Sequence, residues 1–151
     1  MDNTWVLVAN ASRANLYATE RIGKKMTCLK DFAHPESRAK GSTLASDRPG
    51  HYQSRGTGHG SMGDPADPKY FEANRFAGEL ASELNAGRKA NDFRRLVLVA
   101  GPHFHGLLNA HLNEHTRAMV ENYIHKDLTG CPEVELPGRL VKNIPAKELP
   151  L

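Results

Sequence analysis

The chain has 151 residues, of which 39% are hydrophobic and 25% are charged, and its net charge is +3. A domain of this length buries about 68–70% of its unfolded surface, so a hydrophobic core forms without disulfide or metal staples. The two cysteines, Cys28 and Cys131, match no zinc or redox spacing, and the N-terminal apolar run is too short for a signal peptide or a membrane span. We therefore expect one cytoplasmic domain over residues 1–151 with no membrane partner, and its mild positive charge is compatible with RNA without establishing it.

Three strands are predicted before residue 35. Residues 4–9 (TWVLVA) form a continuous apolar run, which is typical of a strand buried on both faces. Residues 13–19 (RANLYAT) follow after a short turn, which favours an antiparallel hairpin. Residues 25–34 (KMTCLKDFAH) alternate, so Met26, Cys28 and Phe32 are predicted to point inward, with Cys28 as a small core residue.

The next stretch, residues 35–64, has neither a helical nor a strand period. It contains six glycines, four basic residues and two histidines. A structureless connection this long inside a small domain is unusual and is either functional or disordered. The sequence therefore predicts a rigid scaffold that presents one long, basic, glycine-rich loop.

The strongest helix pattern in the chain follows this loop. Asp64-Pro65 and Asp67-Pro68 each offer an N-cap followed by proline at the first helical position, and Gly87 is a predicted stop. Glu72 is predicted on the charged side of the helix. The predicted apolar stripe consists of Ala73, Phe76, Ala77, Leu80 and Leu84.

The second half of the chain alternates strands and helices. Residues 95–100 (RLVLVA) predict a central strand, Gly101-Pro102 a turn, and residues 103–113 a second helix. Residues 117–124 are ambiguous between strand and helix, and their place after a strand–helix unit favours a strand; a short helix is predicted near residues 133–140. The order βββαβαβ(α) predicts an α/β fold with a single mixed β-sheet, resembling the ribonuclease H-like arrangement.

Two metal-site hypotheses are weak. Neither central strand carries the carboxylates that a two-metal nuclease of that architecture needs, and Asp31 and Asp127 are expected to be solvated. His111-Leu112-Asn113-Glu114-His115 matches the H-x-x-E-H string of inverted zinc peptidases, but it falls at the end of its predicted helix and needs a third ligand. We therefore predict no metal and no other cofactor.

Candidate phosphate contacts lie in two places. His103 and His105 follow the second central strand where a helix begins, and such positions favour anionic ligands. An ordinary turn with two exposed imidazoles is the alternative. Within the loop, positive charge and an aromatic ring for stacking on a base are typical of single-strand RNA binding. The candidates there are Arg38, Lys40, Arg48, His51, Tyr52, Gln53, Arg55 and His59.

Four stretches carry a resemblance to a known family, and they follow one another over nearly the whole chain. They are Asp47-Arg48-Pro49-Gly50, residues 67–80, residues 95–100 with their proline turn, and Lys126-Asp127-Leu128-Thr129. In these motifs the chain resembles the bacterial host-attachment protein family. That family is also described as a bacterial branch of the archaeo-eukaryotic peptide release factor superfamily.

The resemblance implies a domain similar to the middle domain of release factors, whose glycine-rich loop carries Gly-Gly-Gln and helps water attack peptidyl-tRNA. This chain has no Gly-Gly-Gln, and Gln53 is its only glutamine. The expected function is therefore a cytoplasmic module that binds the ribosome or tRNA through the loop. The alternatives are an ester hydrolase that uses Gln53 with His51 or His59, and a factor that acts in host attachment through a protein partner.

Overall fold

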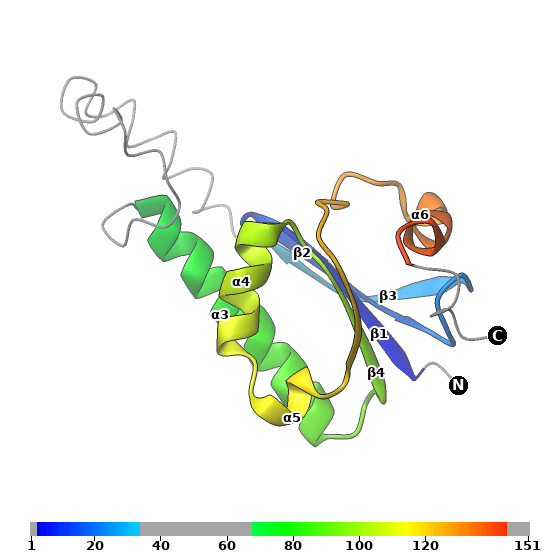
Figure 1. Cartoon of the computed structure of the whole chain (residues 1–151), viewed down its shortest axis with the longest axis horizontal. Helices are drawn as coiled ribbons and strands as arrows, with labels where there is room; N and C mark the ends of the chain where they lie inside the picture. Colours follow the sequence, from blue (N-terminus) through cyan, green and yellow to red (C-terminus); the bar gives the residue numbers. More distant parts are fainter. Residues whose placement is uncertain (1–2, 34–67, 145–151) are drawn as a thin grey trace.

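Five strands form one mixed sheet in the computed structural model, which describes residues 3–33 and 68–144 (Figure 1). The strands are β1 (Thr4–Ala9), β2 (Arg13–Thr19), β3 (Met26–Ala33), β4 (Arg95–Val99) and β5 (Val120–Ile124). Their order across the sheet is β3-β2-β1-β4-β5. β1 pairs parallel with β4, and β4 pairs parallel with β5, whereas β1–β2 and β2–β3 are antiparallel. The predicted α/β class, the single mixed sheet and the order of elements are confirmed.

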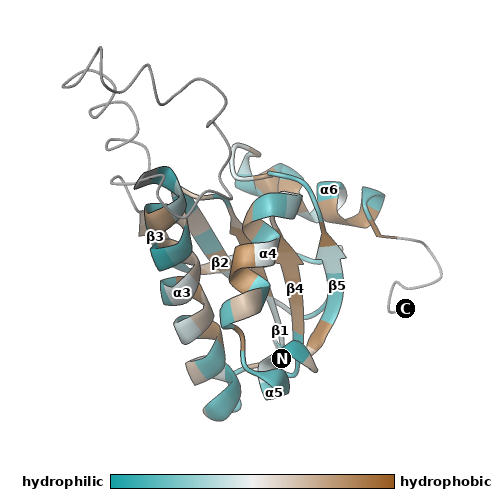
Figure 2. Cartoon of the chain, turned by 60° about the vertical axis from the view of Figure 1, so that its left-hand side comes forward, coloured by the Kyte–Doolittle hydropathy of each residue, from teal (hydrophilic) through white to brown (hydrophobic). Residues whose placement is uncertain are grey.

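Helices cover both faces of this sheet. One face carries α3 (Pro68–Lys89), α4 (Pro102–His111) and the four-residue α5 (Glu114–Arg117). The other face carries the short η1 (Glu133–Glu135) and α6 (Leu136–Lys142). Because side chains alternate along a strand, Leu7 of β1 packs in the cluster under α3 and α4, whereas Val6 packs in the cluster under α6. Figure 2 shows the hydrophobic residues of β4 beside helices that carry both hydrophilic and hydrophobic residues.

The long helix α3 follows the predicted pattern with two corrections. Its apolar stripe is buried as predicted, but Glu72, which was predicted on the charged side, is only 6% exposed. Glu72 lies one turn before Phe76 and therefore shares the buried face of the helix.

Gly87 does not end the helix, which continues to Lys89. A Cβ atom at Gly87 would lie 2.5 Å from Cζ3 of the Trp5 ring, so glycine here allows α3 to approach β1 closely. The left-handed backbone that follows the helix is found instead at Asn91, with φ of 61°.

The strand β3 forms one edge of the sheet, and this position overturns the prediction for Cys28. Met26 is buried and Phe32 is partly buried against the core cluster, but Cys28 is exposed, as are most residues of this outermost strand. Its thiol lies 3.2 Å from Oδ1 of Asp31. Partial loss of hydration of the thiol and its hydrogen bond to Asp31 raise the pKa of Cys28, so this cysteine is not an activated nucleophile.

The ambiguous segment, residues 117–124, contains the predicted strand. Residues 120–124 form β5, with Ile124 buried and Tyr123 40% exposed, and Arg117 is the last residue of the short helix α5. His111 ends α4 and His115 belongs to α5, so the two histidines of the H-x-x-E-H string do not share one helix. His111 instead forms a 2.9 Å hydrogen bond with Asn74 of α3.

The whole of the predicted glycine-rich loop, residues 35–64, lies outside the described residues. The candidate contacts that fall there are Arg38, Lys40, Arg48, His51, Tyr52, Gln53, Arg55 and His59.

Candidate nucleic-acid interface

The carboxyl ends of four strands meet at one edge of the sheet. Val8 of β1 pairs with Val99 of β4, which pairs with Ile124 of β5, so these parallel strands end at the same level. β3 also runs in the direction of β1, and its last residue, Ala33, pairs with Arg13 at the start of β2. We call this end of the sheet, which is formed by the ends of strands and not by an outermost strand, the carboxyl edge. Ligands of open α/β sheets bind preferentially at such an edge.

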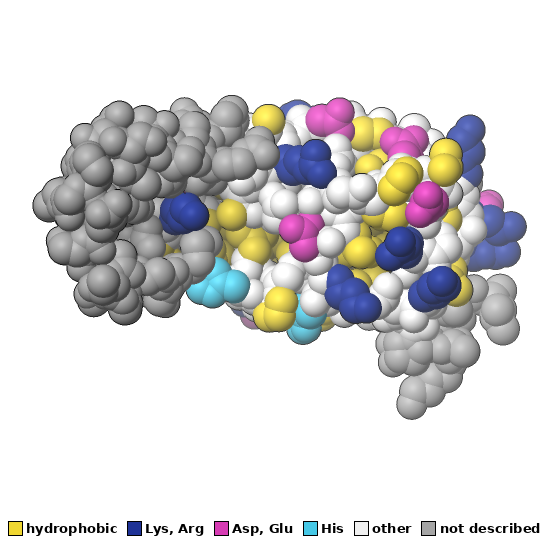
Figure 3. Space-filling view, turned by 90° about the horizontal axis from the view of Figure 1, so that it is seen from above, with side chains coloured by type: hydrophobic (Ala, Val, Ile, Leu, Met, Phe, Trp, Pro, Cys, Tyr) yellow, Lys and Arg dark blue, Asp and Glu magenta, His cyan; other side chains and the backbone are white. Residues whose placement is uncertain are grey.

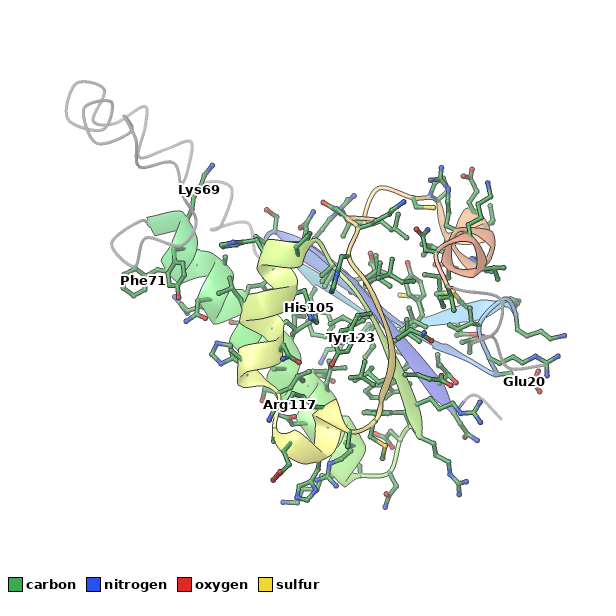
Figure 4. The ribbon with its side chains drawn as sticks, viewed as in Figure 1. Glu20, Lys69, Phe71, His105, Arg117 and Tyr123 are labelled. Atoms are coloured by element: carbon green, nitrogen blue, oxygen red, sulfur yellow. The ribbon has the colours of Figure 1, made fainter. Side chains whose placement is uncertain are left out.

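Segment 34–67 connects two elements at this end of the molecule. Figure 1 shows the end of β3 and the start of α4 at the carboxyl edge, with the first turns of α3 extending beyond it. Lys69 and Phe71 lie in the first turn of α3 and point away from the sheet (Figure 4). The side chain of Phe71 is 57% exposed. An aromatic side chain of the kind that stacks on nucleic-acid bases therefore stands beside the point where the basic segment joins the helix.

Asn10 organises the turn between β1 and β2. Its Oδ1 accepts hydrogen bonds from the backbone N–H of Ser12 (2.8 Å) and of Arg13 (3.0 Å). Its Nδ2 donates to Oδ2 of Asp127 (3.1 Å) and to Oγ1 of Thr129 (3.0 Å). Asn10 thus closes its own turn and also bonds to a residue 117 positions away in the sequence. This second contact holds the segment after β5 at the carboxyl edge.

The carboxylate of Asp127 is held by several donors. Its Oδ1 accepts from the backbone N–H (3.0 Å) and the hydroxyl (2.6 Å) of Thr129. Burial alone would raise the pKa of Asp127, but the hydrogen bonds from Thr129 and Asn10, together with the charge of Arg13, hold it below its ordinary value. Arg13 also donates to the backbone carbonyl of Thr129 at 2.8 Å. Asp127 is exposed to solvent, as expected from the sequence, and its hydrogen bonds also order this segment.

Three rings form a cluster between α4 and β5. The ring centroid of His105 lies 4.5 Å from that of Tyr123, in an edge-on arrangement, and 4.7 Å from that of His125. Tyr123 and His125 are two residues apart and extend from the same side of β5 and its continuation. Figure 4 shows His105 beside Tyr123 beneath α4. Burial and the neighbouring charge of His125 lower the pKa of His105.

His103 and His105 have different surroundings, although both were predicted to be phosphate contacts. His103 is exposed in the first turn of α4, whereas His105 is half-buried in the ring cluster. The N-cap, Gly101, provides no side-chain hydrogen bond to the start of this helix. Backbone N–H groups in the first turn of a helix favour anions, so His103 lies where a phosphate would be stabilised.

The structure brings five further side chains to the carboxyl edge that sequence reasoning did not include among the site residues. They are Asn10, Arg13, Tyr123, His125 and Thr129. The Asn-Ala-Ser turn and the spacing of two between Tyr123 and His125 were visible in the sequence. Their shared location depends on strand order, which those local signals do not specify.

The upper side of the molecule in Figure 1 is mixed in character. Figure 3 looks onto this side and shows Lys, Arg and His side chains interspersed with apolar and acidic ones. In residues 3–33 and 68–144, no three His, Cys, Asp or Glu side chains are grouped as ligands of a metal ion. None of the described helices combines the length and the apolar character needed to cross a membrane.

The fold and this edge define an α/β-sheet protein whose polar and aromatic side chains converge at the carboxyl ends of its parallel strands. Residues 5–140 match the model of a family described as a protein required for attachment to host cells, and the chain belongs to that family. A comparison with curated proteins finds no significant match. The predicted host-attachment family is thus confirmed over most of the chain.

Proposed function

We propose that the protein is an RNA-binding module, related to the middle domain of release factors, that docks on the ribosome or tRNA in the cytoplasm. The observation that carries this proposal is the pairing of Ala33 with Arg13 at the carboxyl edge. Through that pairing, the basic glycine-rich segment starts at the same end of the sheet as the first turn of α4 and the ring cluster. A cationic segment beside exposed rings is the combination that single-stranded nucleic acid binds.

The residues divide into two roles in this proposal. Arg38, Lys40, Arg48 and Arg55 contact phosphates, with His51, Gln53 and His59 beside them. His103 adds a phosphate contact at the start of α4, and Tyr52 and Phe71 offer rings for stacking on bases. Phosphate contacts position the RNA without reading its sequence, so we expect affinity to depend more on charge than on base sequence.

The test is the salt dependence of binding to fluorescently labelled tRNA, measured by anisotropy, with co-sedimentation on ribosomes as a second assay. A variant with Arg38, Lys40, Arg48 and Arg55 all changed to Gln should lower the magnitude of the log–log salt slope by about 0.7 per lost contact. The matched control changes Arg21, Lys24 and Lys25 to Gln. These residues lie in and beside the turn after β2, at the opposite end of the sheet, near Glu20 in Figure 4.

The loop variant removes four positive charges and the control removes three, so an equal loss of binding free energy per charge removed would show that only net charge matters. Absence of salt-sensitive binding to tRNA and of ribosome association would overturn the proposal. The same samples are assayed for hydrolysis of the ester of peptidyl-tRNA, which releases the free peptide and deacylated tRNA. Turnover that Gln53→Ala abolishes would replace a binding role with a hydrolytic one.

A further inference from the structure

The contact between His105 and His125 joins two elements that are remote in the sequence. His105 comes from the first half of α4, and His125 follows the last residue of the edge strand β5. Their ring centroids are 4.7 Å apart with an interplanar angle of 45°, and Tyr123 lies against both rings. His125 is exposed and His105 is half-buried, so a ligand can reach the pair from solvent on the side of β5.

His125 is the charged group that acts on His105, and no carboxylate acts on it among the described residues. From β5 the rings face Tyr123. Glu121, two residues before Tyr123, is paired with Arg95 at 3.9 Å, and the next charged side chain after His125 is the exposed Lys126. The carboxylate of Asp127 is engaged by Asn10 and Thr129. On the other side of α4, the neutral Asn74 and Asn85 of α3 bond to the end of α4 and to Asn113 beyond it.

An imidazole beside a second imidazole resists protonation unless an anion accompanies the proton. Burial and the charge of His125 lower the pKa of His105 accordingly. When both rings are protonated, each presents two N–H donors and no acceptor, which suits the oxygens of a phosphate. The location of His105 near the start of α4 adds the favourable end of the helix dipole.

We propose that His105 and His125 form a phosphate subsite that takes up protons when an RNA phosphodiester binds. This inference rests on the proposed RNA-binding function for the source of the phosphate, and it adds His125 and a pH dependence to that site. A bound anion stabilises the protonated rings, so proton binding and phosphate binding strengthen one another by the same factor.

The sign of the pH dependence follows from this linkage. Free His105 titrates below the ordinary value of about 6.5, and a bound phosphate raises its pKa. Between the free and the bound pKa, affinity rises about tenfold for each unit by which the pH falls, per proton taken up. Below the free pKa and above the bound pKa the affinity no longer changes with pH. A transition metal held by the same imidazoles would show the opposite trend, because metal ligands must be deprotonated.

The experiment measures binding of an oligouridylate of about 12 nucleotides by anisotropy between about pH 5 and 8 at constant ionic strength. Uridine and phosphodiester groups do not titrate in the range of histidine, so any proton uptake belongs to the protein. We expect the wild type to bind about tenfold more tightly per pH unit of acidification for each proton taken up. His125→Asn should lower that slope by the share of the His105–His125 pair, whereas His51, His59 and His103 keep their own share. His115→Ala, which removes an exposed imidazole from α5, is the matched control and should keep the wild-type slope.

A second measurement follows the ring C–H signals of His105 and His125 by NMR during titration with sodium diethyl phosphate. Shifts of both rings without oligouridylate binding would retain the phosphate subsite and reject the RNA-binding function. Oligouridylate binding with the same pH profile in wild type and His125→Asn would reject the subsite and retain RNA binding. Absence of both signals would reject both proposals, and signal changes only with added Zn²⁺ at high pH would identify a metal site instead.

Discussion

The two faces of the sheet are closed by different means. On the first face, the 22-residue α3 and the 10-residue α4 pack large apolar side chains such as Phe76, Leu80 and Phe104 against the sheet. On the second face, the seven-residue α6 contributes Leu136 and Leu140, and a connection from β5 covers the rest. The first face therefore depends on apolar packing, whereas the second also depends on hydrogen bonds that hold the connection in place.

This difference is related to the site. The hydrogen bonds of the second face are made by Asn10, Asp127 and Thr129, which lie at the carboxyl edge. The ring cluster of His105 and His125 belongs to the first face but reaches the same edge. Residues that close the sheet on one side thus also shape the proposed binding edge.

The largest expected effect is on the free energy of unfolding, when one buried side chain is truncated in the core of each face. Phe76→Ala should lower the free energy of unfolding by about 4 kcal/mol, because it removes a fully buried aromatic ring beneath the longest helix. Leu140→Ala on α6 should cost about 2 kcal/mol, at the low end for such a change, because a short helix can shift to fill the space.

Both values come from urea unfolding followed by circular dichroism. Val134→Ala, at a position that is 87% exposed, is the surface control and should leave the unfolding free energy almost unchanged. A larger loss for Leu140→Ala than for Phe76→Ala would contradict the difference between the faces.

A second test concerns how closely α3 approaches β1. Gly87→Ala should destabilise the protein by about 1–3 kcal/mol, because its Cβ would lie 2.5 Å from the Trp5 ring and the side chains must shift. Gly106→Ala in α4 is the matched control, since no atom lies within 4 Å of its added Cβ, and it should stabilise the helix by about 0.5–1 kcal/mol. Thermal unfolding measures both variants, and a gain in stability at each position would refute the close contact.

A third test breaks the hydrogen bonds of the second face. Asp127→Asn should cost about 1 kcal/mol at neutral pH, a value reduced by the exposure of this carboxylate. The folded-state pKa of Asp127 is lowered, so its contribution is present above the unfolded value of about 3.9 and is lost as the pH falls through the folded value.

Urea unfolding at neutral pH and in acid should therefore show a difference from wild type that disappears in acid. Asp92→Asn, at an exposed position after α3, serves as the control. A difference that persists unchanged in acid would mean that the Asp127 charge does not hold the connection.

Sequence patterns predicted the fold better than the site for a physical reason. Continuous apolar runs such as residues 4–9 and 95–100 report burial on both faces, and both became central strands. Cys28 was misplaced because alternation along a strand does not reveal whether helices cover it, and β3 is an edge. Glu72 was wrongly predicted on the exposed side of the helix because it is charged, although its spacing of four residues from Phe76 places it on the buried side.

The site was harder to predict because its contacts join distant residues. His105 was a candidate from its place at the start of a helix, but its partners are 18 and 20 residues further along the chain. Asn10 resembled an ordinary turn residue, and only the strand order brings Asp127 to it. Local sequence patterns identify helices and strands. Which residues meet at the carboxyl edge depends on which strands become neighbours in the sheet.

The smallest effect at neutral pH is expected at Tyr17 on the second face. Its pKa is raised to about 12, chiefly by burial, with smaller contributions from the charges of Cys28, Glu133, Asp31 and Cys131. Because the folded-state value lies above the unfolded value of about 10, the contribution of Tyr17 is intact below pH 10 and is lost as the pH rises toward 12. Relative to Tyr17→Phe, the wild type should therefore lose stability only in that alkaline window.

Ultraviolet absorbance of the phenolates measures the ionisation of Tyr17, and unfolding in urea measures the stability. Tyr123→Phe, at a 40% exposed ring, is the control. Ionisation of Tyr17 at the same pH as Tyr123 would mean that water reaches Tyr17, which is the only buried tyrosine among the described residues. The apolar packing of the second face would then be weaker than the structure indicates.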